Sequence, residues 1–161
     1  MDYALTIQVQ DSDIDELGHA SNIAYIRWLQ DVAVAHSTSV GLGWGAYLDL
    51  GAVFVIRRQE VDYLRPALRG ETLELRTRIC NVAAANVQRE TDFTRPADGV
   101  VIARALTTWV FVDAKRGRPT RIPDHVRTAF GFPPRVRRSA GDEPDVVVAQ
   151  RSSNSVNGDG P

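Results

Sequence analysis

The chain has 161 residues and a net charge of −1 at pH 7, from 19 basic and 20 acidic residues. This length fits one domain with a tail, and the balanced charge favours neither a nucleic acid nor an anionic membrane as the main partner. The single cysteine, Cys80, excludes an internal disulfide and a cysteine-based metal cluster. Neither a signal peptide nor an apolar run of ~20 residues is visible, so we expect a cytoplasmic protein.

The first third of the chain changes from a strand pattern to a helix pattern. Residues 3–9 alternate in polarity and predict a strand. Residues 22–40 carry apolar side chains at helical spacing and on further faces as well, which is typical of a buried helix. Four glycines between residues 41 and 51 then indicate a loop.

Four strand-like runs follow, at residues 52–64, 71–82, 85–93 and 100–112. One strand, one long helix and four consecutive strands predict an α+β fold, in which a mainly antiparallel five-stranded sheet wraps around one long buried helix. Residues 123–130 suit a short helix. We place the end of the domain at residue 133 and expect residues 134–161 to be a disordered tail, because they offer little apolar surface to bury.

The segment between the first strand and the helix concentrates side chains that can do chemistry. Residues 11–25 read Asp-Ser-Asp-Ile-Asp-Glu-Leu-Gly-His-Ala-Ser-Asn-Ile-Ala-Tyr. Asp and Asn near a helix start have a structural explanation, since they cap free N–H groups and favour the helix dipole. However, Gly18 permits an unusual backbone conformation directly before His19, and a helix N-terminus can hold an oxyanion. A carboxylate, an imidazole and such a helix end together suit a hydrolase.

The run from Asp15 to Tyr25 resembles the Asp-x-x-Gly-His-x-Asn-Asn-x-x-Tyr signature of the 4-hydroxybenzoyl-CoA thioesterase-like family of the hot-dog superfamily. The order of the elements is similar to that fold, and residues 63–71 resemble its turn with a Pro, a Gly and an acidic residue. Ser21 stands where the family has its first Asn. The family's Glu partway along the helix has no clear counterpart, Gln30 and Asp31 being nearest. The resemblance spans about residues 3–130.

This resemblance implies an acyl-CoA thioesterase that needs no cofactor beyond the CoA of its substrate. It implies that Asp15 is the catalytic general base or nucleophile, with His19 beside it, and that the helix N-terminus near Asn22 polarises the thioester carbonyl. Asn22 and Tyr25 would shape the substrate site. The resemblance also implies sites at a subunit interface, and we expect a homodimer or homotetramer because one such sheet leaves an edge strand uncovered.

Arginines are the remaining candidates for substrate binding. Arg57, Arg58 and Arg65 could meet the phosphates of CoA, because guanidinium binds phosphate in a bidentate geometry, although an ordinary exposed face explains them equally well. The other polar side chains have simpler interpretations: His36 fits a packed position on the helix, and Asp11, Asp13 and Glu16 fit solvated loop charges.

Two other functions remain open at this point. A hot-dog dehydratase or hydratase also uses an acidic residue and a histidine on an acyl thioester, although the signature resembles the thioesterases better. A non-catalytic acyl-thioester-binding domain could keep the same fold. The expected partner is an acyl-CoA or acyl-carrier-protein thioester, with no nucleic acid and no membrane, and the acyl group stays open.

Overall fold

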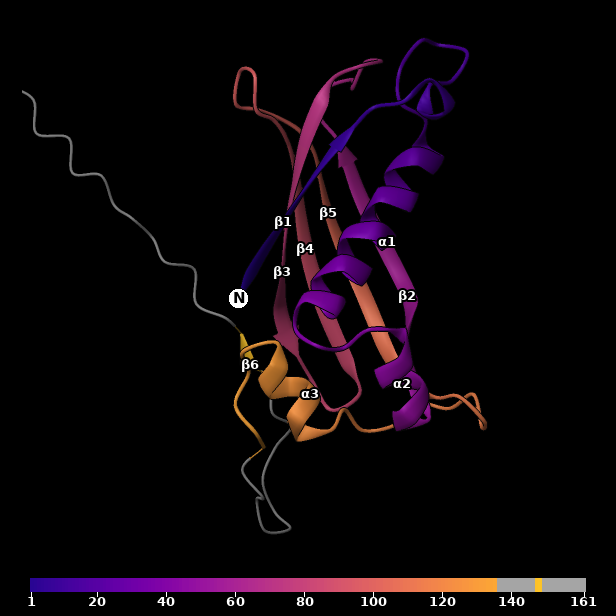
Figure 1. Cartoon of the computed structure of the whole chain (residues 1–161), viewed down its shortest axis with the longest axis vertical. Helices are drawn as coiled ribbons and strands as arrows, with labels where there is room; N and C mark the ends of the chain where they lie inside the picture. The colour runs from indigo at the N-terminus through magenta and orange to yellow at the C-terminus, as the bar shows by residue number, and fades with distance from the viewer. Residues whose placement is uncertain (136–146, 149–161) are drawn as a thin grey trace, which may run out of the picture.

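The computed structural model describes residues 1–135 and 147–148, and its elements follow the predicted order (Figure 1). The N-terminal part holds strand β1 (Asp2–Gln8), a short 3-10 helix (Asp11–Asp13), helix α1 (Asn22–Ser39) and helix α2 (Trp44–Leu50). The remaining elements are strands β2 (Ala52–Tyr63), β3 (Thr72–Val82), β4 (Asn86–Arg95) and β5 (Val100–Asp113), helix α3 (Asp124–Ala129) and the two-residue strand β6 (Val147–Val148).

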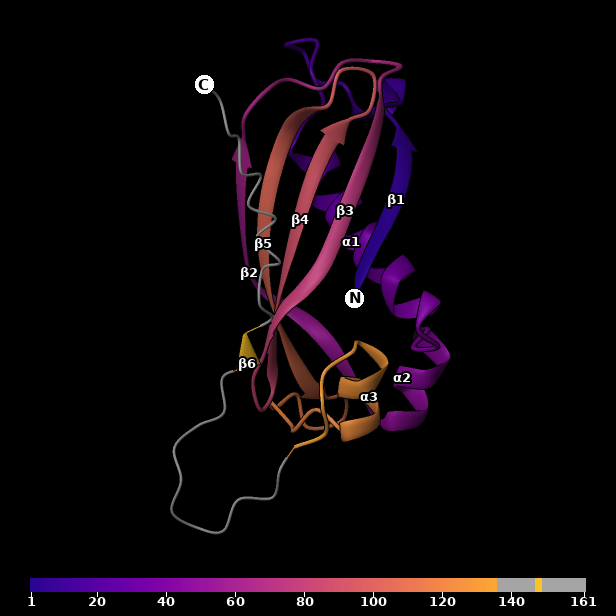
Figure 2. The same cartoon turned by 90° about the vertical axis from the view of Figure 1, so that its left-hand side faces the viewer.

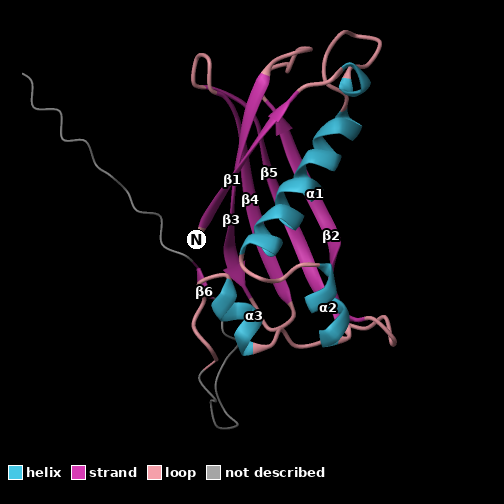
Figure 3. Ribbon diagram, in the orientation of Figure 1, coloured by secondary structure: helices cyan, strands magenta, loops and turns pink. Residues whose placement is uncertain are grey.

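The five long strands form one antiparallel sheet in the order β1-β3-β4-β5-β2. Helix α1 lies along one face of this sheet, and the strands curve around it (Figures 2 and 3). The predicted α+β arrangement is therefore confirmed. Strand β2 is at an edge, and among the described residues only β5 pairs with it.

The core between α1 and the sheet consists of two hydrophobic clusters. The upper cluster, at the top in Figure 1, surrounds the first half of α1 and includes Tyr25, Trp28, Leu75 and Phe93. The lower cluster lies near α2 and α3 and includes Tyr47, Ile79, Val87, Phe111 and Phe130. Strand alternation explains most of both clusters, because over much of β3, β4 and β5 every second side chain is buried.

Helix α1 is not buried on all sides, contrary to the expectation from its composition. Val32 is fully buried against the sheet, whereas Ile23 is 79% exposed and Val34 is 58% exposed. One chain covers only the face of α1 that meets the sheet. Among the described residues, the helix therefore leaves apolar side chains such as Ile23 and Val34 uncovered. No helix in the described part of the chain combines the length and hydropathy that a bilayer crossing demands.

Two segments differ from their predicted structure. Residues 44–50 form helix α2 instead of a loop, because Gly43 and Gly51 flank the helix rather than interrupt it, Gly51 ending it with a φ of +63°. Val147 and Val148 belong to the segment expected to be a disordered tail, yet they pair with Val82 and Asn81 of β3. The rest of that tail from residue 136 lies outside the described residues.

Candidate active site

A tight turn between β1 and α1 carries Asp15 and His19. The Gly18 N–H donates to the Asp15 carbonyl (3.0 Å), and the Asp15 N–H donates to the His19 carbonyl (2.9 Å). Gly18 has a φ of +79°, a conformation in which a side chain would be strained. The backbone thus holds Asp15 and His19 opposite each other at the base of the turn, and both residues are exposed.

The Asp15 carboxylate is only partly engaged by the protein. Its Oδ1 accepts a hydrogen bond from the Leu17 N–H (2.9 Å), and no other described residue donates to this carboxylate. His19 makes no side-chain hydrogen bond or ion pair with a described residue, so the two groups do not form a hydrogen-bonded pair in this state. Asp15 therefore keeps acceptor capacity for a water molecule or a substrate.

The start of α1 adds free N–H donors next to this turn. Ser21 is the N-cap, and its Oγ accepts from the Ala24 N–H (3.2 Å). Serine is one of the preferred residues at the N-cap. The N–H groups of Asn22 and Ile23 have no acceptor among the described residues, and they lie at the positive end of the helix dipole. Two free donors at a helix start can stabilise an oxyanion.

Asp13 stabilises the turn from the interior of the protein. The prediction that Asp13 is a solvated loop charge was therefore wrong. It is 1% exposed. Its Oδ2 accepts from the Gln10 N–H (2.8 Å), its Oδ1 is bound by the guanidinium of Arg27, and its carbonyl accepts from the Ser21 N–H (2.8 Å). Asp13 thereby joins the end of β1, the helix cap and the body of α1.

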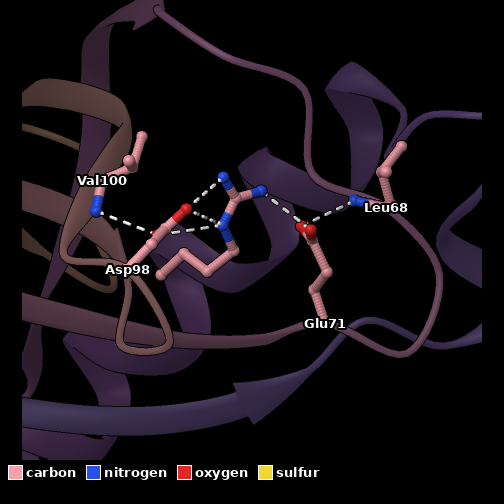
Figure 4. Close-up of polar contacts among 5 residues, drawn as sticks. Leu68, Glu71, Asp98 and Val100 are labelled. Atoms are coloured by element: carbon pink, nitrogen blue, oxygen red, sulfur yellow. Dashed lines mark hydrogen bonds and ion pairs between the residues drawn. The ribbon is translucent and has the colours of Figure 1, made fainter.

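A second support holds the turn from the side. The Ala20 N–H donates to the carbonyl of Ala67 (2.9 Å), which lies in the turn between β2 and β3. In that turn the Glu71 carboxylate accepts from the Leu68 N–H (2.9 Å) and from Arg95 of β4 (2.8 Å). Figure 4 shows Glu71 and Asp98 on opposite sides of one guanidinium, which is that of Arg95 (2.7 Å to Asp98). The β4–β5 turn is thus fastened to the loop that carries Asp15.

Of the other predicted site residues, Asn22 lies at this site and Tyr25 lies beneath it. Asn22 is exposed as the first residue of α1. Tyr25 is buried in the upper cluster, in edge-on contact with Tyr63 and Phe93 at ring distances of 5.0 and 5.4 Å. Burial raises the pKa of Tyr25 to about 12. Tyr25 therefore supports the helix start from the core instead of facing the turn.

The three predicted phosphate-binding arginines are exposed, but they do not gather at one place in the chain. Arg57 and Arg58 lie at an irregularity of β2, and Arg58 forms an ion pair with Glu60 (3.1 Å). Arg65 follows the end of β2 and donates to the Leu64 carbonyl (2.6 Å). At about 3.3 Å per residue, Arg65 lies roughly 20 Å from Arg58 along the strand. A single chain cannot direct all three at one phosphate group.

A cavity of about 230 Å³ lies at the other end of α1, between this helix, α2 and the sheet. Its walls are mostly apolar and include Val34, Trp44, Phe54 and Trp109. The α1 residues that line it run from Gln30 to Thr38, which is about 12 to 24 Å along the helix axis from Asn22. Arg89 of β4 also lines this cavity, a residue that the sequence pattern did not single out.

The described residues hold no group of three or more His, Cys, Asp or Glu side chains that could bind a metal ion. The polar groups of the Asp15 turn and the apolar cavity differ in the chemistry that they offer. One offers a carboxylate with an anion-binding helix end. The other offers a shaped apolar space.

Comparison with known proteins identifies the family and the fold. A family model for the thioesterase-like superfamily matches residues 9–130. The acyl-acyl carrier protein thioesterase ATL2 of Arabidopsis thaliana is 26% identical over 129 residues, which cover 80% of this chain and 68% of that protein. Protein THEM6 of Danio rerio is 32% identical over 110 residues, which cover 68% of this chain and 52% of that protein.

Solved structures show the same architecture. A 1,4-dihydroxy-2-naphthoyl-CoA thioesterase from Synechocystis superposes with a TM-score of 0.75 at 18% identity, covering 81% of this chain and 96% of that one. A gentisyl-coenzyme A thioesterase superposes with a TM-score of 0.70 at 23% identity, covering 80% of this chain and 98% of that one. At these identities the likeness concerns the fold, and it confirms the predicted hot-dog arrangement.

Proposed function

The chain belongs to the thioesterase-like superfamily, and on this premise we propose that it hydrolyses an acyl thioester to a free acid and a thiol. The observation that carries the proposal is the Asp15 turn, in which an exposed carboxylate precedes a helix start with two free N–H donors. Relatives that are named thioesterases or acyl-carrier-protein hydrolases support the same reaction. CoA or acyl-carrier protein would supply the thiol.

The proposed chemistry needs a nucleophile and a site for negative charge. Asp15 takes a proton from water, which attacks the thioester carbon, or Asp15 attacks that carbon itself and water then hydrolyses the resulting anhydride. Negative charge develops on the carbonyl oxygen, where the N–H groups of Asn22 and Ile23 can bind it. Such donors contribute about 3 kcal/mol each in comparable sites. Collapse of the intermediate expels the thiolate, which takes up the proton.

We propose that two chains build the complete site. A short acyl group that fills the cavity cannot have its thioester at Asp15 of the same chain, because the cavity begins about 12 Å along α1 from Asn22. A second copy can bring its own Asp15 turn to the cavity mouth. The open edge of β2 and the exposed side chains of Ile23, Trp44 and Leu48 offer surface for such an association.

The test of the function is thiol release from a panel of acyl-CoA and acyl-carrier-protein thioesters, with short, long and aromatic acyl groups. We expect release from at least one class, and its loss in Asp15→Asn. A dehydratase or hydratase would alter the acyl chain and leave the thioester intact, and a binding domain would show affinity without product. Either outcome would refute the proposed hydrolysis.

The proposed association of two chains is tested by the molecular mass in solution. Light scattering at micromolar concentration should give the mass of a dimer or a larger oligomer. A monomeric mass in a preparation that still hydrolyses thioesters would exclude the two-chain site.

A further inference from the structure

A polar layer separates the two hydrophobic clusters on the inner face of the sheet. Its members are the buried side chains of Thr77, Thr91, Thr107 and Arg89, which alternate in register with apolar neighbours, and His36 of α1. Thr77 and Thr91 hydrogen-bond to each other through their hydroxyls (2.9 Å). The threonine hydroxyls are neutral, but an arginine in this layer introduces a full charge.

Arg89 is 4% exposed and is not neutralised. Among the described residues no carboxylate forms an ion pair with it. Both of its hydrogen bonds use Nη1, with the Nδ1 of His36 at 2.9 Å and the Oγ1 of Thr77 at 3.2 Å. Its Nε is buried with no acceptor. Because burial disfavours the charged form, the pKa of Arg89 is lowered to about 10, so the guanidinium remains protonated at neutral pH.

His36 cannot provide the missing negative charge. Its Nδ1 faces the guanidinium as an acceptor, so its proton is on Nε2, which is also buried without a partner. Burial, and next the charge of Arg89, lower the pKa of His36 to about 4. The imidazole is therefore neutral. Buried polar groups without partners are rare in native proteins and commonly mark a position that a water, an ion or a ligand completes.

Arg89 and Trp109, the residues that carry two of these unmet donors, both line the apolar cavity described above. Arg89 is the one charged residue among those that line it within the described part of the chain. Trp109 lines the same cavity, and its indole N–H is likewise buried without an acceptor. A space with apolar walls and unpaired donors fits a ligand with an apolar body and an anionic end. Its volume of about 230 Å³ lies below the ~300 Å³ of small-molecule pockets in general, which favours a short body.

We infer that this cavity receives an acyl chain whose far end carries a carboxylate, and that Arg89 binds this carboxylate. The substrate class would then be the monothioester of a dicarboxylic acid. The inference rests on the proposed hydrolysis and gives its acyl specificity. A carboxylate that reaches the guanidinium can accept from it and neutralise its charge. A purely alkyl chain would cover the guanidinium and leave the same donors unpaired.

The experiment compares pairs of CoA thioesters that differ only at the far end. Adipoyl-CoA carries a carboxylate where 6-methylheptanoyl-CoA carries an isopropyl group of similar shape, and glutaryl and pimeloyl thioesters vary the length. We expect the wild-type protein to have the higher kcat/KM for the carboxylate member of at least one pair. In Arg89→Met this value should fall roughly 10- to 100-fold, the range for a hydrogen bond to a charged group, while the alkyl member is unchanged or improved.

A binding measurement separates this inference from the proposed hydrolysis. Calorimetric titration of the same thioesters into Asp15→Asn should show the same preference and its loss in the Asp15→Asn, Arg89→Met double variant. If no thioester releases thiol but the binding preference is present, the hydrolysis proposal fails and the assignment of Arg89 stands. Thiol release with equal kcat/KM for both members of every pair overturns the assignment of Arg89 alone. If Arg89→Met does not fold, the ratio of kcat/KM between the carboxylate and the alkyl member of each pair, measured on the wild-type protein, still tests the assignment.

Discussion

The same substitution at two carboxylates, two residues apart, should separate chemistry from structure. In Asp15→Asn the amide oxygen can keep the hydrogen bond from the Leu17 N–H, which is the one bond that this exposed side chain makes. We therefore expect an unchanged melting temperature. A general base contributes about 10²- to 10⁴-fold to a rate, so kcat for thiol release should fall by that factor while the affinity for the thioester is retained.

Asp13→Asn is the matched control. Its two carboxylate oxygens accept from different donors, Gln10 on one side and Arg27 on the other, and an amide can accept on one side only. A buried donor without an acceptor costs about 1–3 kcal/mol, which for a domain of this size lowers Tm by about 3–5 °C per kcal/mol. Thermal melts and thiol release on both variants test the pair. If Asp15→Asn keeps wild-type turnover, or loses activity only in step with its Tm, Asp15 is a structural residue and the mechanism is wrong.

Three further expectations concern groups outside the turn. The pKa of His36 is about 4 in the folded protein and about 6.5 in the unfolded chain, so the unfolded chain binds more protons below pH 6.5 and the free energy of unfolding decreases as the pH is lowered. Urea unfolding should show about 2 kcal/mol less stability at pH 5 than at pH 7.5 from this residue, and His36→Gln should remove that difference. Replacing Arg57 and Arg58 with Gln should weaken CoA binding and make the affinity less dependent on salt concentration. If the affinity changes with neither the substitutions nor the salt concentration, the phosphates bind elsewhere. Arg95→Met releases Glu71 and Asp98, so the amides of Ala20 and Gly70 should exchange hydrogen faster by mass spectrometry; unchanged exchange would show that the Arg95 contacts do not hold the Asp15 loop.

The architecture was predictable because the strand and helix periodicities are strong. The observed α1 begins at the predicted Asn22 and ends one residue before the predicted Val40, and every long strand overlaps its predicted range. Helix α2 was missed since its glycines were counted as breakers. Gly43 and Gly51 instead cap the two ends of the helix. The helix itself is stabilised by the packing of Tyr47 into the lower cluster, a tertiary contact that the local sequence does not show.

The site was predictable only in its outline. Asp15 and His19 share one turn, and Asn22 begins the helix that follows it, as the spacing indicates. Asp13 looked like its neighbouring carboxylates because its partner Arg27 is fourteen residues away on α1. Arg89 lies in a run in which both faces of β4 carry polar residues, so only Val87 and Phe93 indicate which face is buried. The parity of Val87 and Phe93 would have placed it inside, against the general rule that arginine stays exposed.

The polar layer between the two clusters has a consequence for how substitutions combine. The upper cluster supports the Asp15 turn, and the lower cluster forms walls of the cavity, so residues of the two groups share few neighbours. Free-energy effects add when sites are more than about 7–10 Å apart and have no common partner. Effects on the free energy of unfolding from substitutions in the cavity walls and at the turn of one chain should therefore add, whereas their effects on turnover should couple, because the proposed two-chain site brings the turn of one chain to the cavity of the other. Substitutions in the layer itself, at His36 or Thr77, are where that independence should break down.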